Sequence, residues 1–524
     1  MRAVLLHPPL CDPSSPPLGL AYLSAVLVRE GMEHEVLDLN LDFLDFLDGL
    51  VPSLPGEARQ ASAVAHTRRA CAAAARMWPD VRLEPWRLEL PRADGNLAVM
   101  ADIAQAHNGP FTAWLRDMDP LAAALARGPV WIGLSVSFMG QLAPALAIAA
   151  HIRQRSQATV ILGGSLFKEF ERWITPETPI WNVAHGVVVG PGEDVLRNLE
   201  QSPDGVWRPR DVNDLPGGGW IASSSGLFDP PRPCFDHFPL DRYRAAGRVL
   251  PYRVFARCSW GKCAFCADSK YAAHTPAAGG EAEAVAEELT ALARRHGAKG
   301  FYFLDAELPE KFMLDLARHM MRLGPDLRWG ANARFARDLE YQARADLLFA
   351  GGCRFLRFGL ESASPRVLAA MRKGISPELA ARVLQAVHGA GMATHVYLMR
   401  GFPGETDGEW DATVHFLLDN ARHIDMFNVS VFQLYPGSPL ALRLGPQDGS
   451  GASPARWIYA GQESGMTTLD TRKLEEDFFV RKNFTRCHPT PADTILLADT
   501  ESIRFGNASD DTGHQCPEDE EMAP

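Results

Sequence analysis

Three cysteines lie close together in the segment RCSWGKCAFCADSKY, which covers residues 257–271. Four residues separate Cys258 from Cys263, and two residues separate Cys263 from Cys266. Because thiolates prefer soft metals, a loop of this composition is expected to hold either zinc or an iron-sulfur cluster. The number of ligands that the loop provides distinguishes these two alternatives.

A cluster fits three thiolates better than zinc does. Structural zinc sites close with four ligands, which usually come as two close pairs. The nearest histidines in the sequence, His237 and His274, flank the loop without a paired spacing. A 4Fe-4S cluster held by three thiolates leaves one iron open, and an open iron can bind a substrate or cofactor. We therefore interpret the loop as a 4Fe-4S site.

Short β-rich runs alternate with helical patterns in residues 1–200. Strands are predicted at residues 2–9, 34–40, 130–138, 158–164 and 185–190. Helices are predicted between them, including an Ala-rich insertion over about residues 41–127. This alternation predicts an α/β fold with a doubly wound, Rossmann-like parallel sheet, which binds ligands beyond the carboxyl ends of its strands.

A second series of six predicted strands, again separated by helical patterns, covers residues 250–440. Six such units predict a partial β/α barrel, with its active site at the carboxyl ends of the strands. Residues 201–249, rich in Pro, Gly and Ser, are predicted to be a linker. Residues 441–524 are predicted to form a small C-terminal region with an acidic tail that is disordered by composition.

The composition narrows the class of protein. A chain of 524 residues with 46% hydrophobic and 22% charged residues is typical of a globular protein with more than one domain. No apolar run approaches the ~20 residues that span a bilayer, so we expect a cytoplasmic protein without a membrane partner. The net charge of −12 provides no global attraction for nucleic acid. Nine cysteines, an odd number, argue against a disulfide framework.

The cysteine loop and the segments that follow it resemble the cobalamin (B12)-binding radical S-adenosylmethionine (SAM) enzyme family. In that family the cluster loop follows the first barrel strand and has an aromatic residue directly before its last cysteine, here Phe265. The commonest family spacing is three then two residues, whereas this chain has four then two. The additional residue lies within SWGK, away from the close cysteine pair.

The resemblance implies a SAM site at the strand ends. FLDAEL, ANARF, RFGLESASPRVLAAMRKG and LMRGFPGET are similar to family segments that contact the methionyl amino group, the methionyl carboxylate, the nucleoside and the cofactor backbone. The implied SAM-binding residues are Phe265, Asp305, Glu307, Arg334, Glu361, Gly401 and Gly404. Alternatively, the charged residues form ordinary salt bridges at the strand ends, and the glycines are plain turn residues.

Residues 1–200 resemble the cobalamin-binding domain of the same family. The implied cobalamin-binding residues are small or polar and follow predicted strands: Ser135, Ser137, Gly163, Gly164, Gly190, Gly192 and Glu193. The Asp-x-His-x-x-Gly motif that supplies a histidine to cobalt in other cobalamin proteins is absent, and Asn40 stands where the histidine would be. A nicotinamide-binding fold is disfavoured, because no Gly-x-Gly-x-x-Gly follows the first strand.

The resemblance implies a methyltransferase that uses a 5'-deoxyadenosyl radical to methylate an unactivated carbon or phosphorus of a small-molecule or peptide substrate. Its cofactors would be a 4Fe-4S cluster, S-adenosylmethionine and cobalamin, and its partner an electron donor such as flavodoxin or ferredoxin. The alternatives are a non-methylating cyclase or rearrangement enzyme, a methylthiotransferase, and a sensor that binds the cluster or cobalamin without catalysis. Cys11 and Cys71 do not provide the second cluster that a methylthiotransferase requires.

Overall fold

The computed structural model describes residues 2–51, 70–78, 82–84, 87–89, 109–444 and Leu474. Within the longest of these ranges, it leaves out residues 172–173, 211, 213–214, 216–218, 224–231, 246, 256, 268–280, 325 and 436. Most of the predicted C-terminal region, with its acidic tail, therefore lies outside the described residues. Among the residues described, no helix is both long and apolar enough to cross a membrane.

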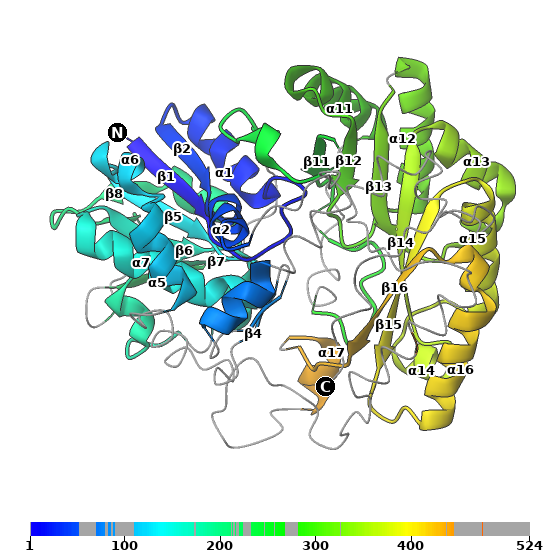
Figure 1. The fold of residues 1–524 in the computed structure, drawn as a ribbon. Helices are drawn as coiled ribbons and strands as arrows, with labels where there is room; N and C mark the ends of the chain where they lie inside the picture. Colours follow the sequence, from blue (N-terminus) through cyan, green and yellow to red (C-terminus); the bar gives the residue numbers. More distant parts are fainter. Residues whose placement is uncertain are drawn as a thin grey trace.

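The first sheet has six parallel strands, which confirms the doubly wound α/β fold (Figure 1). In spatial order they are β10 (Trp220–Ser223), β7 (Gly186–Val189), β6 (Thr159–Gly163), β5 (Trp131–Ser135), β1 (Arg2–His7) and β2 (Glu33–Asp38). The central strands are continuous apolar runs, because both faces of this sheet are covered. The strand order reverses between β1 and β5, and such a switch point is where open α/β sheets bind ligands.

Helices cover both faces of the first sheet. Ala3 and Leu5 of β1 pack with α1 (Leu18–Arg29) and α9 (Gly192–Arg197), whereas Val4 and Leu6 belong to the cluster on the opposite face. That opposite face is covered by α2 (Leu39–Asp48), α5 (Pro110–Met118), α7 (Leu142–Arg155) and α8 (Ser165–Phe170). Alternate residues of one strand thus belong to two separate cores.

The predicted insertion is largely helical where the structure describes it. It contains most of α2, a helix over residues 70–77, α5 and α6 (Ala122–Ala126). It also contains a short antiparallel pair that the sequence did not predict, formed by β3 (Arg82–Glu84) and β4 (Arg87–Glu89).

The prediction that residues 201–249 form only a linker is wrong for part of that segment. β8 (Leu199–Gln201) pairs with β9 (Trp207–Pro209), and β10 adds the last strand to the first sheet. β10 is held by Trp220, whose fully buried ring lies where a side chain at Gly186 would otherwise be. The four-residue run WIAS is too short to show a strand period, which is why the Pro- and Gly-rich context led to a linker prediction.

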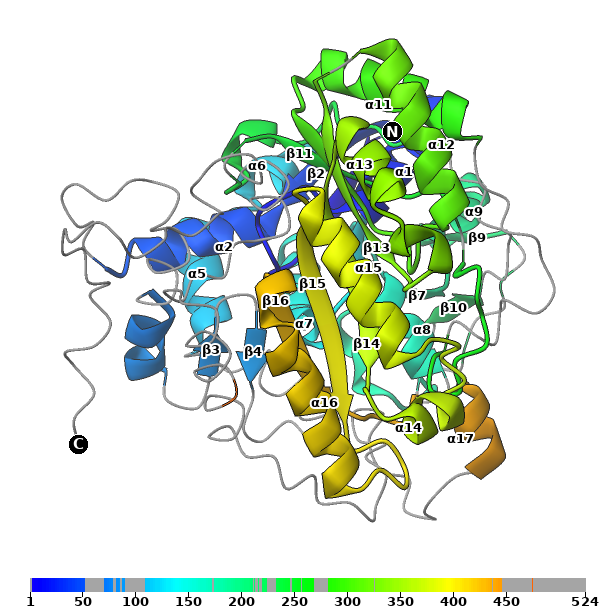
Figure 2. The same ribbon diagram turned by 90° about the vertical axis from the view of Figure 1, so that its right-hand side faces the viewer.

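The second sheet is also parallel, and its six strands pair in sequence order (Figure 2). They are β11 (Val249–Tyr252), β12 (Gly300–Phe303), β13 (Arg328–Ala333), β14 (Cys353–Glu361), β15 (Ala393–Arg400) and β16 (Met426–Val431). Helices cover one face: α11 (Ala282–His296), α12 (Glu310–Leu323), α13 (Gln342–Ala350), α15 (Pro377–Gly389) and α16 (Asp407–Asp419). The sheet order has β11 and β16 at its two ends, which confirms a partial rather than closed barrel.

The two sheets are joined by a continuous apolar cluster. α1 contributes Leu20 and Tyr22 to the same cluster as Leu250 and Tyr252 of β11. The Tyr22 hydroxyl donates a hydrogen bond of 3.2 Å to the carbonyl of Arg253, just after β11. The relative position of the two sheets is therefore set by packing between α1 and β11.

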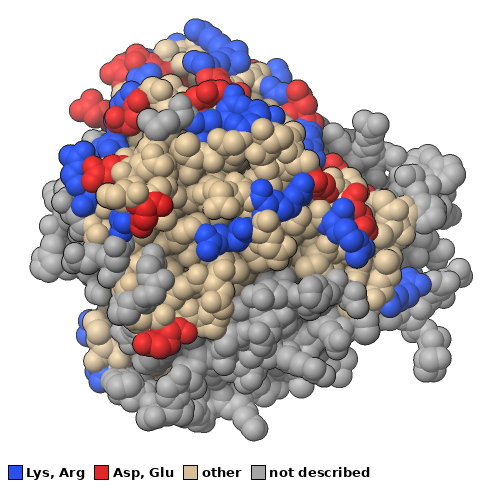
Figure 3. Space-filling model, turned by 90° about the vertical axis from the view of Figure 1, so that its left-hand side faces the viewer, with Lys and Arg blue, Asp and Glu red and all other residues tan. Residues whose placement is uncertain are grey.

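Charged side chains do not form a field of one sign on the face shown in Figure 3, which is the outer face of the first domain. Lys and Arg are interspersed with Asp and Glu, and uncharged residues lie between them. Mixed charge of this kind provides no long-range steering for a polyanion on that face.

Glycine at position 164 should be necessary for the stability of the first domain. Gly164 has φ +111°, and a Cβ there would lie 2.2 Å from the carbonyl oxygen of Val136. We expect Gly164→Ala to lower the free energy of unfolding by roughly 3 kcal/mol or more, because strain and a backbone clash add. Gly128→Ala is the matched control. Gly128 has φ +63° with nothing within 4 Å of the added Cβ, so it should cost only about 1–2 kcal/mol. Urea denaturation of both variants checks this, and equal losses would contradict the clash.

Candidate active site at the strand ends

The three cysteines lie on the loop that follows β11, where the sequence predicted them. Cys258, Cys263 and Cys266 are all half-buried. Among the residues that the structure describes, no three His, Cys, Asp or Glu side chains converge on a point where one metal ion would bind. The loop thus provides three thiols. That donor set fits a cubane cluster, which bonds each thiolate to a different iron.

Two acidic residues after β12 hold the cysteine loop by accepting hydrogen bonds from its backbone. Glu307 Oε2 accepts hydrogen bonds from the Ser259 backbone N–H at 3.0 Å and from its hydroxyl at 2.7 Å, and it lies 3.7 Å from Cys258 Sγ. Asp305 Oδ1 accepts from the N–H groups of Val254 at 3.1 Å and Phe255 at 2.6 Å. Both carboxylates therefore position the chain on either side of the first cysteine.

The environment of Asp305 is unusual for a carboxylate. Burial raises its pKa to about 6, although the backbone hydrogen bonds from Phe255 and Val254 act in the opposite direction. Because its oxygens are directed at the backbone, the structure gives Asp305 a role in holding the segment before Cys258. Contact with a ligand remains a prediction for this residue.

The four-residue spacing between the first two cysteines contains a tryptophan anchor. Trp260 Nε1 donates a hydrogen bond of 3.0 Å to the carbonyl of Arg372. Its ring packs against Gly374, where a Cβ would lie 2.3 Å from Trp260 Cζ2. Four residues later, the Ala264 N–H donates to the carbonyl of Met371 at 2.8 Å. The cysteine loop is thus docked on residues 371–374, the turn that follows α14 (Pro365–Ala370).

Two cations lie beside the middle cysteine. The Arg334 guanidinium stacks on Trp260, 4.2 Å from the ring centroid, and its Nη2 donates to the Lys373 carbonyl at 2.6 Å. Burial raises the pKa of the Cys263 thiol, and the positive charges of Lys373 and Arg334 oppose that rise. The cations favour the thiolate form that a metal requires.

Glu361 is placed by a buried ion pair with one of these cations. Lys373 Nζ lies 2.8 Å from Glu361 Oε1, and each side chain is only 11% exposed. Glu361 has φ +68°, and the register between β14 and β15 shifts between Gly359 and Glu361. A Cβ at Gly359 would lie 2.5 Å from Glu361 Oε1, so the pair needs glycine there. Lys373 also lies over the ring of Phe265, 5.8 Å from its centroid.

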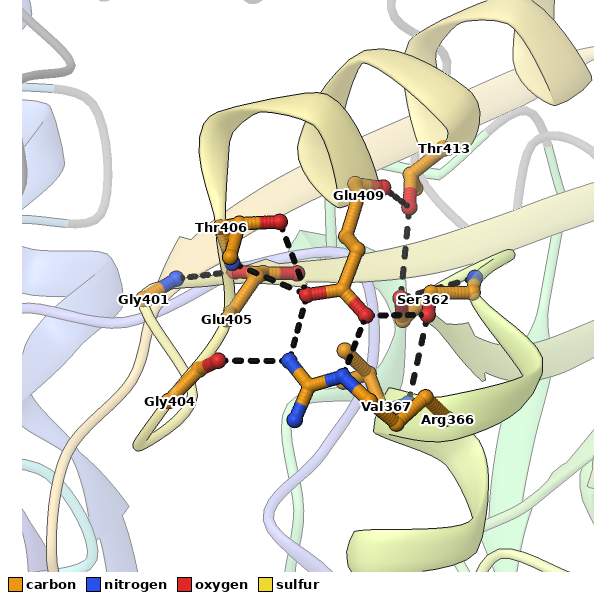
Figure 4. A network of polar contacts seen from close by, with 10 residues as sticks. Ser362, Arg366, Val367, Gly401, Gly404, Glu405, Thr406, Glu409 and Thr413 are labelled. Carbon is orange, nitrogen blue, oxygen red and sulfur yellow. Dashed lines mark hydrogen bonds and ion pairs between the residues drawn. The ribbon is translucent and has the colours of Figure 1, made fainter.

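A polar network fixes the turn that contains Gly401 and Gly404 (Figure 4). Both glycines have positive φ, +84° and +82°. Glu405 Oε2 accepts a hydrogen bond of 2.6 Å from the Gly401 N–H, and Arg366 Nη2 donates to the Gly404 carbonyl at 2.5 Å. Arg366 in turn forms a bidentate pair with Glu409, with Nε–Oε1 at 2.7 Å and Nη2–Oε2 at 2.5 Å. The turn is therefore rigid enough to present its backbone to a ligand.

The predicted SAM-binding residues thus fall into two groups. Phe265, Arg334 and Glu361 meet beside Cys263, and Glu307 meets Cys258. Asp305 and the two glycines instead shape the neighbouring backbone. Sequence reasoning missed four residues that hold this arrangement together: Trp260, Lys373, Arg366 and Glu405.

The predicted cobalamin-binding residues share one edge of the first sheet. Ser135 and Gly163 end β5 and β6, and Gly192 begins α9. The others directly follow the strands or lie in the first turn of α9: Ser137, Gly164, Gly190 and Glu193. Burial raises the pKa of Glu193, and the charge of Arg253 in the second domain opposes the rise. This edge therefore reaches the boundary between the two domains.

Asn40, which stands where the histidine of an Asp-x-His-x-x-Gly motif would be, is bonded to the protein itself. Asn40 lies in the first turn of α2 and is 1% exposed. Its amide accepts from the Cys11 N–H at 3.1 Å and donates to the Cys11 carbonyl at 3.0 Å. Asn40 therefore holds the loop after β1. His7, at the end of β1, lies 2.8 Å from Cys11 Sγ within the same loop.

Most of the second domain matches a known protein-family model. Residues 252–417 match the model of the Radical SAM superfamily. An uncharacterized methyltransferase of Pyrococcus horikoshii is 28% identical over 305 residues, or 55% of this chain and 60% of that protein. The bacteriochlorophyllide d C-12(1)-methyltransferase of Chlorobaculum tepidum is 28% identical over 203 residues, or 37% of this chain and 42% of that protein. The chain thus spans less than two thirds of the length of these curated relatives.

The fold of both domains together also occurs in a solved structure. TsrM from Kitasatospora setae, a radical S-adenosylmethionine methyltransferase, has a TM-score of 0.53 with this chain at 19% identity. The match covers 94% of this chain and 89% of TsrM. TsrM has been solved with tryptophan and a SAM analogue bound, and also with cobalamin and a [4Fe-4S] cluster bound. The similarity shows that the two-domain fold is shared.

Removing the tryptophan anchor should loosen the cysteine loop. In Trp260→Ala the hydrogen bond to Arg372 and the packing on Gly374 are lost, so local opening becomes easier. We expect the Ala264 amide to exchange with solvent at least about tenfold faster, the equivalent of ~1.4 kcal/mol. Trp260→Phe, which keeps a ring, should give a smaller effect. Tyr341→Ala removes a ring that is 57% exposed and serves as control. Unchanged exchange at Ala264 in Trp260→Ala would disprove the anchor.

Proposed function

We propose that this chain, whose residues 252–417 match the model of the Radical SAM superfamily, is a cobalamin-dependent radical SAM methyltransferase. One observation carries the proposal. The three-cysteine loop and the small-residue edge of a doubly wound sheet occur in one chain, and a shared apolar cluster holds their two domains together. Two curated relatives are named methyltransferases, and TsrM has been solved with both cobalamin and a cluster, which supports the same conclusion.

We assign the cluster to Cys258, Cys263 and Cys266. When bound, the cluster, S-adenosylmethionine and cobalamin supply a 5'-deoxyadenosyl radical and a methyl group for an unactivated carbon or phosphorus of the substrate. The protein contributes charge and position. Arg334 and Lys373 place positive charge beside the thiolates, and Glu307 holds the first cysteine in place.

We assign S-adenosylmethionine to the surroundings of the cysteine loop. The fork of the Arg334 guanidinium suits the methionyl carboxylate, because it can form two parallel hydrogen bonds. Glu361 keeps one oxygen on Lys373 and lies where the family places a contact to the nucleoside. Gly401 and Gly404 themselves carry no side chain that would keep the cofactor from their backbone.

We assign cobalamin to the carboxyl edge of the first sheet. A corrin with its nucleotide tail needs small residues at the strand ends, and the edge offers them at β5, β6 and β7. The serine hydroxyls can satisfy polar atoms of the tail. With Asn40 hydrogen-bonded to Cys11, the protein brings no histidine to cobalt from an Asp-x-His-x-x-Gly motif.

The substrate in this proposal is a small molecule or a peptide, and a flavodoxin or ferredoxin supplies electrons. A methylthiotransferase is disfavoured, because Cys11 and Cys71 are both buried in the first domain. A non-methylating rearrangement with the same cofactors is distinguished by the fate of the methyl group.

Replacing the three cysteines together should abolish the cluster. Anaerobically reconstituted Cys258→Ala/Cys263→Ala/Cys266→Ala should retain little iron or sulfide and none of the visible charge-transfer absorbance of the wild type. It should also form no 5'-deoxyadenosine from S-adenosylmethionine. Cys234→Ala is the matched control, because Cys234 is also half-buried but lies outside the loop. A full complement of iron in the triple variant would disprove the assignment.

Label from the methyl group of S-adenosylmethionine should appear in the product. The test incubates candidate metabolites and peptides with reduced holoenzyme and methyl-labelled S-adenosylmethionine and measures the masses of the products. Product should carry the label, and 5'-deoxyadenosine and S-adenosylhomocysteine should form in comparable amounts, because one molecule provides the radical and another the methyl group. Product with 5'-deoxyadenosine but without label would identify a rearrangement instead.

A further inference from the structure

Arg357 projects from the middle of β14 on the face of the second sheet that is not covered by helices. Its neighbours in β14, Leu356 and Phe358, are fully buried in the large core cluster shared with the helices. Because successive strand residues point to opposite faces, Arg357 lies on the other face. In the register of the sheet, Arg357 is adjacent to Asn332 of β13 and His395 of β15. This face is directed toward the first domain (Figure 1).

Three aromatic rings surround the Arg357 guanidinium. Its Cζ lies 5.4 Å from the ring centroid of Tyr302, 5.6 Å from that of Phe355 and 5.3 Å from that of Tyr397. The three rings come from β12, β14 and β15, so the site is built by the sheet rather than by a loop. Aromatic faces stabilise a cation and leave its N–H edge available for hydrogen bonding.

The guanidinium lacks a protein counter-charge among the residues that the structure describes. Its Nε is buried and has no hydrogen-bond partner there. Of the acidic residues nearby, Glu361 is paired with Lys373, and Asp12 accepts a hydrogen bond from the Ser14 N–H at 2.9 Å. Buried donors in native proteins are nearly always hydrogen-bonded to protein, water or a ligand, so the Arg357 guanidinium is available to an anion that reaches this face.

Glu361 is on the same strand as Arg357, and Gly359 lies between them. The register between β14 and β15 shifts between Gly359 and Glu361, and a Cβ at Gly359 would lie 2.5 Å from Glu361 Oε1, so the Glu361 carboxylate folds back over Gly359. Burial raises the pKa of Tyr397, the charge of Arg357 opposes this rise, and the charge of Glu361 adds to it. Both charges therefore lie near the Tyr397 hydroxyl. A small molecule held at Arg357 would thus extend toward the cluster loop.

We propose that Arg357 binds an oxyanion of the substrate, a carboxylate or phosphate-type group, and that Tyr302 and Tyr397 contact the apolar body attached to it. This inference rests on the proposed function in taking the occupant to be the substrate. It identifies the substrate class as a small molecule that carries a carboxylate or phosphate-type group. A guanidinium suits both anions, because each can accept two parallel hydrogen bonds from it.

The flanking polar groups complete the site. His395 Nε2 and Asn428 Oδ1 lie 2.6 Å apart, and the Tyr302 hydroxyl lies 3.4 Å from Asn332 Oδ1. These contacts place polar side chains from β12, β13, β15 and β16 around the cation. They can distinguish substituents on the ligand, whereas Arg357 provides the charge.

Binding of simple aryl anions to the full-length protein tests the proposal. The probes are benzoate, phenylphosphonate and, as the uncharged analogue, benzyl alcohol, measured by ligand-observed NMR titration without S-adenosylmethionine. We expect wild-type protein to bind at least one anion, and Arg357→Gln to weaken that binding at least about tenfold. Arg357→Lys, which keeps the charge but not the fork, should be intermediate. The ratio of the two anion affinities distinguishes a carboxylate from a phosphate-type substrate.

Arg354→Gln is the matched control. Arg354 is in the same strand, and its guanidinium donates to the Phe349 carbonyl at 2.6 Å and stacks on the Phe349 ring. The Arg354→Gln variant should leave probe binding unchanged. Equal anion affinity in Arg357→Gln and wild type, or benzyl alcohol binding as tightly as the anions, would overturn the proposal. Thermal melting shows that each variant is folded.

Iron content and 5'-deoxyadenosine formation separate this inference from the proposed function. Arg357→Gln should keep the cluster and the ability to cleave S-adenosylmethionine while it loses anion binding. If the wild type neither assembles a cluster nor cleaves S-adenosylmethionine but still binds the anions through Arg357, the proposed function fails and the anion site stands.

Discussion

Packing between α1 and β11 is the constraint on which the other features depend. Both sheets are parallel, so each presents its candidate ligand-binding residues at the carboxyl edge of its strands. Ligands at the two edges can react with each other only if the two sheets keep a fixed relative position. Leu20 and Tyr22 of α1 share a core with Leu250 and Tyr252, and the Tyr22 hydroxyl is bonded to the first carbonyl after β11. The same carbonyl lies five residues before Cys258 in the chain. A single contact thus ties the first domain directly to the strand that leads into the cysteine loop.

The cysteine loop itself has little regular structure and depends on its neighbours. Glu307 and Asp305 bind its backbone from β12, and Trp260 docks it on the turn after α14. The same turn also holds two charged side chains near the cysteines. Lys373 forms an ion pair with Glu361, and its carbonyl accepts a hydrogen bond from Arg334. Residues that follow three consecutive strands, β12, β13 and β14, therefore surround the three thiols on the loop after β11. The thiols thus lie in a loop, and residues at the ends of the sheet strands hold that loop in position.

Much of the fold could be predicted from the sequence, because strands buried on both faces are continuous apolar runs separated by helical periods. Both parallel sheets were predicted in this way, whereas the acidic, basic and glycine residues at the strand ends were proposed from the family resemblance. β10 was not, because WIAS is too short to show a period. Lys373 and Trp260 were missed because their roles depend on contacts between segments about 110 residues apart. Arg357 looks like an ordinary strand residue until the register shows which face it occupies.

The docking of Trp260 on Gly374 links two positions that are far apart in the sequence. Any side chain at position 374 would occupy the space of the indole ring, and the φ of +70° at this position also favours glycine. A substitution at 374 would thus act on the cysteine loop from a distance, because it would displace the tryptophan that lies between the first two cysteines.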